Sequence, residues 1–295
     1  MFLTVCLNPT LQKTLSFSSV APNAVNRAAA NRLDASGKGI NVTRVLSQLG
    51  KKAVHLTQLG GGLRTLFLSL CEQDRLSIEW AESGSQIRFC YTVLTENDGN
   101  VTELVEEPEP VAAGTEQRLL EKYDALLSDT SMNLKCLIVS GTKAAGFSNM
   151  MIPLMTRKAK EKGLRIILDI KGNDLIESLK YEPDVIKPNL DEFADTFKTQ
   201  PNKDMIIDVA REYRCRVILT NGSREILAAD GDNFYKININ PVKAVNTTGC
   251  GDAFTAGLAA ALADCREGTD LAAAISEGSR CGALNAGLVR PGVIR

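Results

Sequence analysis

The feature that most constrains the fold of this sequence is an alternation of short apolar runs with helix-length amphipathic segments. The apolar runs are rich in β-branched residues, which is typical of parallel strands covered on both faces. We expect strands at 3–7, 136–140, 165–169, 185–187 and 216–220. We expect helices at 41–49, 114–127, 150–162, 190–197 and 204–213. This repeated βα order predicts an α/β domain of three layers, α/β/α, with a mainly parallel central sheet.

Two regions, 14–33 and 88–106, break this alternation, and the second contains the turn signal Asn97-Asp98-Gly99-Asn100. An Asp-Gly pair at such a position is typical of a β-hairpin. We expect four short strands in a small separate sheet, a lid formed by about 12–34 and 86–107. The alternative is that they are edge strands of the main sheet. So small a sheet needs a partner to cover its other face, which predicts a homodimer through the lid. No interdomain linker is visible, so 1–295 is expected to be one domain.

Charge, cysteine content and histidine content exclude several classes of protein. Lys plus Arg number 34 and Asp plus Glu number 35, a net charge of −1 that gives no general attraction to nucleic acid or to an anionic membrane. No apolar run is long enough to span a bilayer. The eight cysteines include no Cys-x-x-Cys pair and indicate reduced thiols in a cytoplasmic protein. The single histidine, His55, lies in an apolar run, so acid–base chemistry must fall to carboxylates, lysines or tyrosines.

The segment Asn246 to Asp252 reads Asn-Thr-Thr-Gly-Cys-Gly-Asp and precedes a long apolar run. Gly249 and Gly251 allow backbone N–H groups to converge, and a following helix would point its positive end at the same place. A phosphate fits such a loop, and Asp252 would take a proton from an attacking hydroxyl. The alternative is a tight turn in which Asp252 only caps the helix. A thiol at a helix N-terminus such as Cys250 can have a lowered pKa, but tolerance of a small side chain is the favoured explanation for a cysteine at this position.

Polar residues follow the expected strands, at the edge where open α/β folds bind their ligands. They are Asn8, Ser140-Gly141, Asp169, Lys187-Pro188-Asn189 and Thr220-Asn221-Gly222. Because the carboxyl ends of parallel strands meet at one edge of a sheet, these residues are expected to converge on one ligand site.

Taken together, five motifs resemble the pfkB (ribokinase-like) carbohydrate kinases, and within them the 1-phosphofructokinase and tagatose-6-phosphate kinase branch. The motifs are Asn8-Pro9, Gly37-Lys38-Gly39-Ile40-Asn41, Ser140-Gly141, Lys187-Pro188-Asn189-Leu190-Asp191-Glu192 and Gly249-Cys250-Gly251-Asp252. The resemblance covers essentially the whole chain. It implies a ribokinase-like fold and an ATP-dependent phosphotransferase with an alcohol group as acceptor. Sugar phosphates such as tagatose-6-phosphate or fructose-1-phosphate are the implied acceptors.

The family pattern implies roles for the residues on the phosphate side. Asp252 would deprotonate the acceptor hydroxyl, while amides of Gly249, Cys250 and Gly251 would stabilise charge on the transferring phosphoryl group. Glu192 would act on Mg²⁺ through water. Nucleotide contacts are implied for Lys187, Asn189, Thr220, Gly222 and Asn285. A monovalent-cation site, K⁺ for example, is implied for Asn246, Thr248, Gly282 and Gly287.

The acceptor side departs from the branch pattern. Gln12 stands where the branch has an aspartate, and Cys90 and Thr92 stand where its lid strand has asparagine and lysine. A carboxamide offers one acceptor and a donor instead of a charged acceptor pair, so a different acceptor stays open. Arg27 matches an arginine that in relatives reaches the neighbouring subunit's substrate phosphate. The implied acceptor contacts are Gln12, Arg27, Gly37, Lys38, Gly39, Asn41, Arg88 and Ser140.

Two alternative functions remain. One is a kinase of another polyol or of an inositol-type acceptor or its phosphate, favoured by Gln12 and Thr92. The other is a non-catalytic sensor of sugar phosphate or nucleotide, against which the retention of Asp252, Glu192 and the loop glycines argues.

Overall fold

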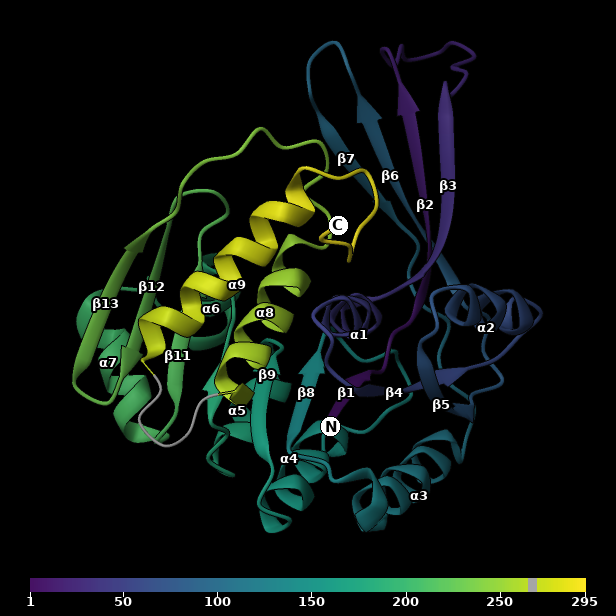
Figure 1. The fold of residues 1–295 in the computed structure, drawn as a ribbon. Coiled ribbons are helices and arrows are strands. Elements are labelled where there is room, and N and C mark those ends of the chain that lie inside the picture. Colours follow the sequence, from purple (N-terminus) through teal and green to yellow (C-terminus); the bar gives the residue numbers. More distant parts are fainter. Residues whose placement is uncertain (265–269) are drawn as a thin grey trace.

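A nine-stranded sheet crosses the part of the chain that the computed structural model describes, residues 1–264 and 270–295 (Figure 1). Its strand order is β13-β12-β11-β10-β9-β8-β1-β4-β5. In this spatial order, the seven strands between β11 and β5, both included, pair in parallel, and β12 and β13 add an antiparallel edge. The bounds are β1 (Phe2–Cys6), β4 (Ala53–Leu59), β5 (Ser77–Glu82), β8 (Cys136–Ser140), β9 (Arg165–Asp169), β10 (Val185–Ile186), β11 (Arg216–Thr220), β12 (Glu225–Asp230) and β13 (Asn233–Asn238).

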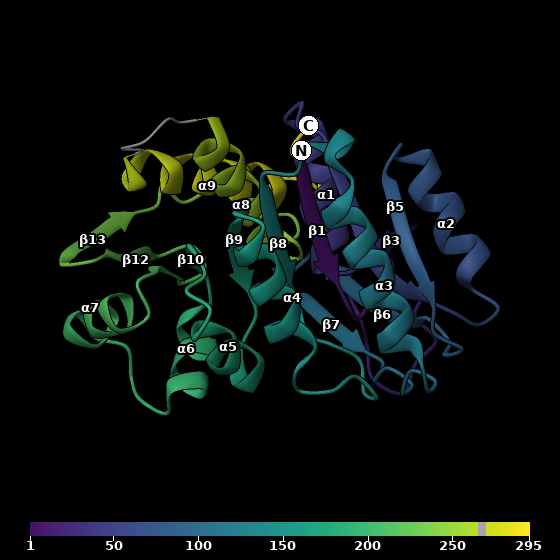
Figure 2. The ribbon, with the colours of Figure 1, turned by 90° about the horizontal axis from the view of Figure 1, so that it is seen from below.

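Helices cover both faces of this sheet (Figure 2). One face carries α1 (Lys38–Gln48), α8 (Cys250–Asp264) and α9 (Leu271–Ala286). The other carries α3 (Thr115–Ser128), α4 (Met151–Glu161), α5 (Gly172–Leu179), α6 (Leu190–Phe197) and α7 (Lys203–Glu212). A separate apolar cluster packs between the sheet and each layer, which explains why strands such as β1 and β8 are buried along their whole length. The expected three-layer α/β/α architecture is confirmed.

The lid is a second, four-stranded sheet in the order β3-β2-β6-β7, and it projects away from the main sheet (Figure 1). Its strands are β2 (Thr10–Phe17), β3 (Ala30–Ser36), β6 (Arg88–Thr95) and β7 (Val101–Val105). The base of the lid packs against α2 (Arg64–Gln73), where Leu11, Ile40 and Phe67 share one apolar cluster. The separate sheet and the hairpin between β6 and β7 are therefore confirmed, and the alternative of edge strands on the main sheet is wrong.

The expected helices are all present: the limits of α6 match, those of the others differ by one to three residues, and α1 begins at Lys38 rather than at 41. The short α2, the single-turn η1 (Thr130–Met132), α5, α9, the strand β12 and the edge strands β5 and β13 were not predicted. Edge strands carry fewer buried positions than central ones, so their apolar signal is weaker.

The cysteines that the structure describes are free thiols, and Cys265 lies outside the described residues. His55 is fully buried in β4, where its Nδ1 lies 2.8 Å from Thr4 Oγ1. Burial lowers the pKa of His55 to about 3, so the ring is neutral, as expected for a core histidine. Among the described helices, none is long and apolar enough to cross a membrane.

Candidate active site

A cavity of about 540 Å³ opens between the lid and the carboxyl ends of the parallel strands. Of the strand-end residues expected to converge here, Lys187, Asn189 and Thr220 line the cavity, whereas Asn8, Gly141 and Asp169 line neighbouring hollows. The lid, α1, α6 and α8 supply the rest of the wall. The predicted residues that line it are Gln12, Gly37, Lys38, Asn41, Arg88, Lys187, Asn189, Glu192, Thr220, Thr248, Gly249, Gly251 and Asp252. Sequence reasoning missed Thr10, Ser36, Val101, Glu103 and Thr247, which also line it.

The loop before α8 presents its backbone to this cavity. Gly249 has φ +83°, and a Cβ there would lie 2.9 Å from the backbone nitrogen of Gly292. Asn285 holds the loop from behind, since its Nδ2 donates to Thr248 O at 3.0 Å and its Oδ1 accepts from Gly292 N at 2.7 Å. The first turn of a helix leaves N–H groups without intrahelical partners, so the start of α8 can bind an anion at the cavity wall.

Burial raises the pKa of the Cys250 thiol, and the hydrogen bond from Asn285 only partly offsets this. The alternative of a lowered thiol pKa at this helix N-terminus is therefore not found. Desolvation outweighs the helix dipole here, and the thiol is protonated at neutral pH.

Asp252 is the third residue of α8 and is almost fully buried. Its Oδ2 accepts a hydrogen bond of 2.8 Å from Asn41 Nδ2, so the carboxylate binds α1 and is not the N-cap of its own helix. The pKa of Asp252 is raised to about 6, with burial as the largest cause. Nearby Asp169 also raises this pKa, while Lys38, the Asn41 hydrogen bond and Lys187 act in the opposite direction. A carboxyl group with a pKa near the working pH is suited to general base chemistry.

Two lysines converge on a second buried carboxylate, Asp169. Its Oδ1 lies 3.3 Å from Lys187 Nζ and 3.6 Å from Lys38 Nζ, and its Oδ2 accepts from Ser140 and Thr255 at 3.0 Å each. Burial alone would raise the pKa of Asp169, but the two lysines outweigh it and lower that pKa. Asp169 in turn raises the pKa of Lys38. Lys38 is thus held as a cation beside Asp252, and Lys187 lies in the same group, where negative phosphate groups would be stabilised.

Asn189 and Glu192 form a capping box at the start of α6. Glu192 N donates to Asn189 Oδ1 at 2.7 Å, and Asn189 N donates to Glu192 Oε2 at 3.0 Å. The other carboxylate oxygen, Oε1, lies 3.6 Å from Lys38 Nζ. One oxygen of Glu192 therefore stabilises the helix, and the other faces the site.

The lid contacts the loop before α8 through a chain of side chains. Gln12 Nε2 donates to Thr92 Oγ1 at 2.8 Å, and Thr92 Oγ1 lies 3.3 Å from Thr248 Oγ1. Thr248 also donates to Glu103 Oε1 at 2.8 Å. Arg88 lines the cavity and donates from Nη1 to Glu106 O. The two departures at Gln12 and Thr92 are thus direct hydrogen-bond partners.

The remaining predicted residues do not line this cavity. Arg27 lies in the exposed loop between β2 and β3, and Gly222 lies beyond the end of β11. The others stand behind the wall. Gly39 packs against Cys6 and His55, and Ser140 donates a hydrogen bond to Asp169. Asn246 Nδ2 donates to Val289 O, Gly282 faces Cys250 O, and Gly287 follows α9. The side chains of Cys250 and Asn285 contact each other behind the loop.

Known proteins are similar to this chain in sequence and in fold. A tagatose-6-phosphate kinase of Staphylococcus epidermidis is 30% identical over 275 residues, which cover 89% of this chain and 85% of that protein. The phosphofructokinase-2 of Escherichia coli, in complex with fructose-6-phosphate, has a TM-score of 0.85 at 21% identity and covers 97% of this chain and 93% of its own. The potassium complex of the same enzyme has a TM-score of 0.86, with the same identity and coverage. Residues 6–291 match the pfkB family carbohydrate kinases, and this chain belongs to that family of kinases.

Proposed function

We propose that this kinase transfers the γ-phosphoryl group of ATP to a hydroxyl group of a small sugar phosphate of the tagatose-6-phosphate or fructose-1-phosphate type. The observation that carries the proposal is the position of Asp252. It is a buried carboxylate with a pKa of about 6, next to a glycine loop at a helix N-terminus and near two lysines. The sugar-phosphate acceptor is supported by the 30% identical tagatose-6-phosphate kinase.

In the proposed reaction, Asp252 takes the proton of the acceptor hydroxyl as its oxygen attacks the γ-phosphorus. The new O–P bond forms while the bond to the β-phosphate oxygen breaks, and ADP leaves. Amides of Gly249, Cys250 and Gly251 stabilise the charge on the transferring group, as preorganised donors do. Lys38 and Lys187 offset the negative charge of the nucleotide. With a pKa of about 6, Asp252 is mostly ionised above pH 7 and can accept the proton.

The residues present fit Mg²⁺, which prefers oxygen ligands and keeps several waters. Asp169 Oδ1 is buried without a hydrogen-bond partner among the described residues. Glu192 supplies a second carboxylate, and Asp169, Glu192 and Lys38 together line an adjoining hollow of about 180 Å³. Glu192, through water, and Asp169 would hold the ion, and the ion would offset charge on the nucleotide phosphates.

We assign a monovalent cation, K⁺ for example, to the segments that contain Asn246, Thr248, Gly282 and Gly287. Their proximity supports this, because Val245 and Asn246 both donate from their backbone to Ala286 O. Among the described residues there is no group of three or more His, Cys, Asp or Glu that could hold a metal, so a cation here would need carbonyl and hydroxyl ligands. Turnover in potassium chloride and in tetramethylammonium chloride tests the assignment, and equal rates would refute it.

A homodimer through the lid is proposed because the hairpin and the β2–β3 loop expose Leu104, Val105 and Val25. Sedimentation of the protein and of Leu104→Glu tests it, and a monomer in both cases would refute it. The free thiols of the described residues fit a reducing compartment, which supports a cytoplasmic location. Fractionation of the source cells would check the location.

A second acceptor class, a polyol or an inositol-type ring, is favoured by one specific observation. Gln12 and Thr92 form a neutral hydrogen-bonded pair where the branch has charged residues, and Glu103 places a carboxylate at the cavity wall. A hydroxyl-rich acceptor can donate to Glu103, whereas a second phosphate near it would be repelled.

The experiment is ADP release with ATP and Mg²⁺ against free sugars, ketohexose phosphates and inositol phosphates, with Asp252→Asn as the matched variant. We expect acceptor-dependent release that Asp252→Asn abolishes, and a fall in kcat of the wild type below about pH 6. The acceptor that is turned over selects between the two classes. Nucleotide binding with no turnover of any acceptor would favour the sensor, and full activity of Asp252→Asn would refute the assigned base.

A further inference from the structure

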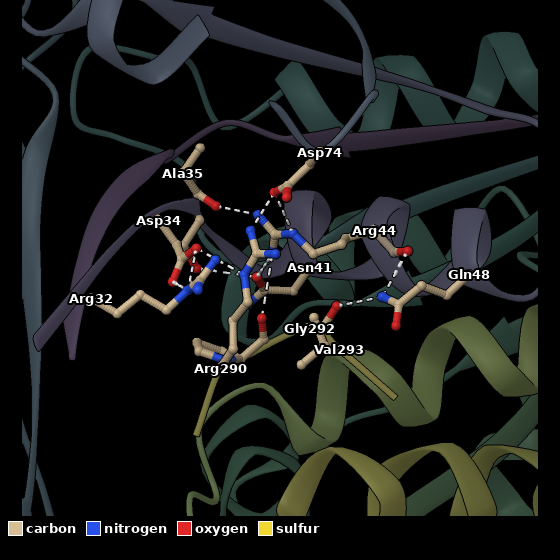
Figure 3. A network of polar contacts seen from close by, with 12 residues as sticks. Arg32, Asp34, Ala35, Asn41, Arg44, Gln48, Asp74, Arg290, Gly292 and Val293 are labelled. Atoms are coloured by element: carbon tan, nitrogen blue, oxygen red, sulfur yellow. Dashed lines mark hydrogen bonds and ion pairs between the residues drawn. The ribbon is translucent and has the colours of Figure 1, made fainter. Parts of the chain in front are cut away.

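A network of charged and polar side chains that includes Asn41 joins α1 to β3, to the end of α2 and to the segment after α9 (Figure 3). Its centre is Arg44, which is three residues after Asn41 on α1 and therefore lies on the same face of that helix. Arg44 is almost fully buried, and its guanidinium group donates in three directions. Nε donates to Asp74 Oδ2 at 2.9 Å, Nη1 to Asn41 Oδ1 at 2.9 Å, and Nη2 to Ala35 O at 2.5 Å.

The contact with Asn41 fixes which way its amide points. Arg44 can only donate, so the atom of Asn41 that faces it must be the carbonyl oxygen. Ser36 Oγ donates to the same oxygen at 3.2 Å. With Oδ1 facing two donors, the amino group must point the opposite way, and it donates to Asp252 Oδ2 at 2.8 Å.

Asp74 pairs with Arg44 and is shared with a second arginine, Arg290. Asp74 follows the last turn of α2 and also accepts from Arg290 Nη2. Arg290, from the segment after α9, pairs in addition with Asp34 of β3, where its Nε lies 2.8 Å from Oδ1. Figure 3 shows that Arg290 and Arg44 approach the same carboxylate, while only Arg44 is linked to Asn41. The cluster is thus anchored on three separate segments of the chain.

We propose that Arg44 is a positioning residue for the phosphoryl transfer, because it orients the Asn41 amide so that Asn41 donates a hydrogen bond to the base Asp252. The proposal rests on the proposed function of Asp252. If the Asn41 amide turned over, its oxygen would face the carboxylate and repel the ionised form. The base would then be a carboxylate only at higher pH, and less of it would be active at neutral pH.

The test compares the kcat–pH profiles of Arg44→Met, Arg44→Lys and Arg290→Met with that of the wild type. Arg44→Lys keeps a cation for Asp74 but cannot reproduce the three directions of the guanidinium group, so it separates charge from geometry. Arg290→Met is the matched control, because it removes a cation from the same cluster without touching Asn41. The carboxyl ¹³C resonance of Asp252, assigned by its loss in Asp252→Asn, gives the pKa without any acceptor.

For both Arg44 variants we expect the acidic limb of the kcat–pH profile and the pKa of Asp252 to rise by about one pH unit. This is the size of shift expected from the loss of one hydrogen bond to a buried charge. At pH 6 kcat should fall several-fold, while the KM for ATP changes little. Arg290→Met should leave the limb in place. In an Asn41→Ala background, Arg44→Lys should cause no further shift, since coupled residues are not additive.

The proposal would be overturned if the acidic limb of the kcat–pH profile stayed at the wild-type pH in both Arg44 variants, or if it shifted equally in Arg290→Met. The second result would assign the effect to the charge of the cluster instead of to the Asn41 amide. Failure of the proposed function looks different, because Asp252→Asn would then turn over the acceptor whatever the Arg44 variants do. Should Arg44→Met fail to fold, Arg44→Lys, which keeps the pairing charge, decides alone.

Discussion

Replacing Asp252 with asparagine should stabilise the protein at the same time as it abolishes turnover. The folded state holds the proton of Asp252 more tightly than the unfolded chain does, because burial raises its pKa from 3.8 to about 6. Stability from this group is therefore present in full below pH 3.8 and is lost as the pH rises through about 6. A difference of about two pKa units corresponds to a cost of about 3 kcal/mol for the ionised carboxylate at pH 8.

Asparagine has the same shape as aspartate and carries no charge to desolvate, and its carbonyl can still accept from Asn41 Nδ2. We expect the Tm of Asp252→Asn to exceed that of the wild type by about 6 °C at pH 8, since each kcal/mol corresponds to about 2 °C for a chain of this size. The gap should narrow between pH 6 and pH 4 and vanish near pH 4. Differential scanning calorimetry across this range measures it, alongside ADP release.

Asp169→Asn is the control with the opposite sign. Lys187 and Lys38 outweigh burial and lower the pKa of Asp169, so its carboxylate contributes stability above the unfolded pKa and loses it as the pH falls. Asp169→Asn should therefore have a lower Tm than the wild type at pH 8. A Tm gap for Asp252→Asn that stays constant with pH, or a wild type that is more stable at pH 8, would refute this electrostatic account.

Two further predictions concern the acceptor and the loop. Gln12→Asp and Thr92→Lys should each lower kcat/KM for tagatose-6-phosphate, because each puts one unpaired charge into a buried neutral pair. In a double-mutant cycle, kcat/KM of the double variant should recover at least tenfold over the worse single variant. Purely additive effects on kcat/KM would contradict direct coupling of the two side chains. Gly249→Ala should lower the free energy of unfolding by about 2 kcal/mol and reduce kcat at least tenfold, since φ is +83° and the added Cβ meets Gly292. Thermal melting and ADP release check this against Gly163→Ala, which has φ +70° and open space, and an equal loss in both variants would show that only backbone strain matters.

The centre of the fold could be predicted from the sequence because central parallel strands are buried on both faces. The residues of β8 and β9, Cys136–Ser140 and Arg165–Asp169, are nearly continuous apolar runs, and their expected limits match the structure. The antiparallel edge strand Asn233–Asn238 has no fully buried residue, so it lacks both the continuous run and a clear alternation. Helix α2 buries only Phe67 and Cys71, which leaves little helical periodicity to detect.

The residues of the site could be predicted one at a time, but their partners could not. Asp252, Asn41 and Lys38 belong to short motifs, whereas the bond between Asn41 and Asp252 joins residues 211 positions apart. Glu103 lies in a lid strand without a motif of its own and meets Thr248 across 145 positions. Arg44 follows a recognised motif by three residues, yet its role depends on Asp74 and on the segment after α9. Such contacts are set by the packing of α1, the lid and the C-terminal segment.

In the proposed mechanism, Asn41 would also link acceptor binding to proton transfer. Its oxygen faces Arg44 and Ser36, and one hydrogen of its amino group is donated to Asp252. The second hydrogen of that amino group is left for a hydroxyl in the cavity, which Asn41 lines. A hydroxyl bound there would lie next to Asp252, the proposed base. In that case the amide orientation that places the hydroxyl is also the one that favours the ionised form of Asp252, so a turned amide would reduce turnover in both ways.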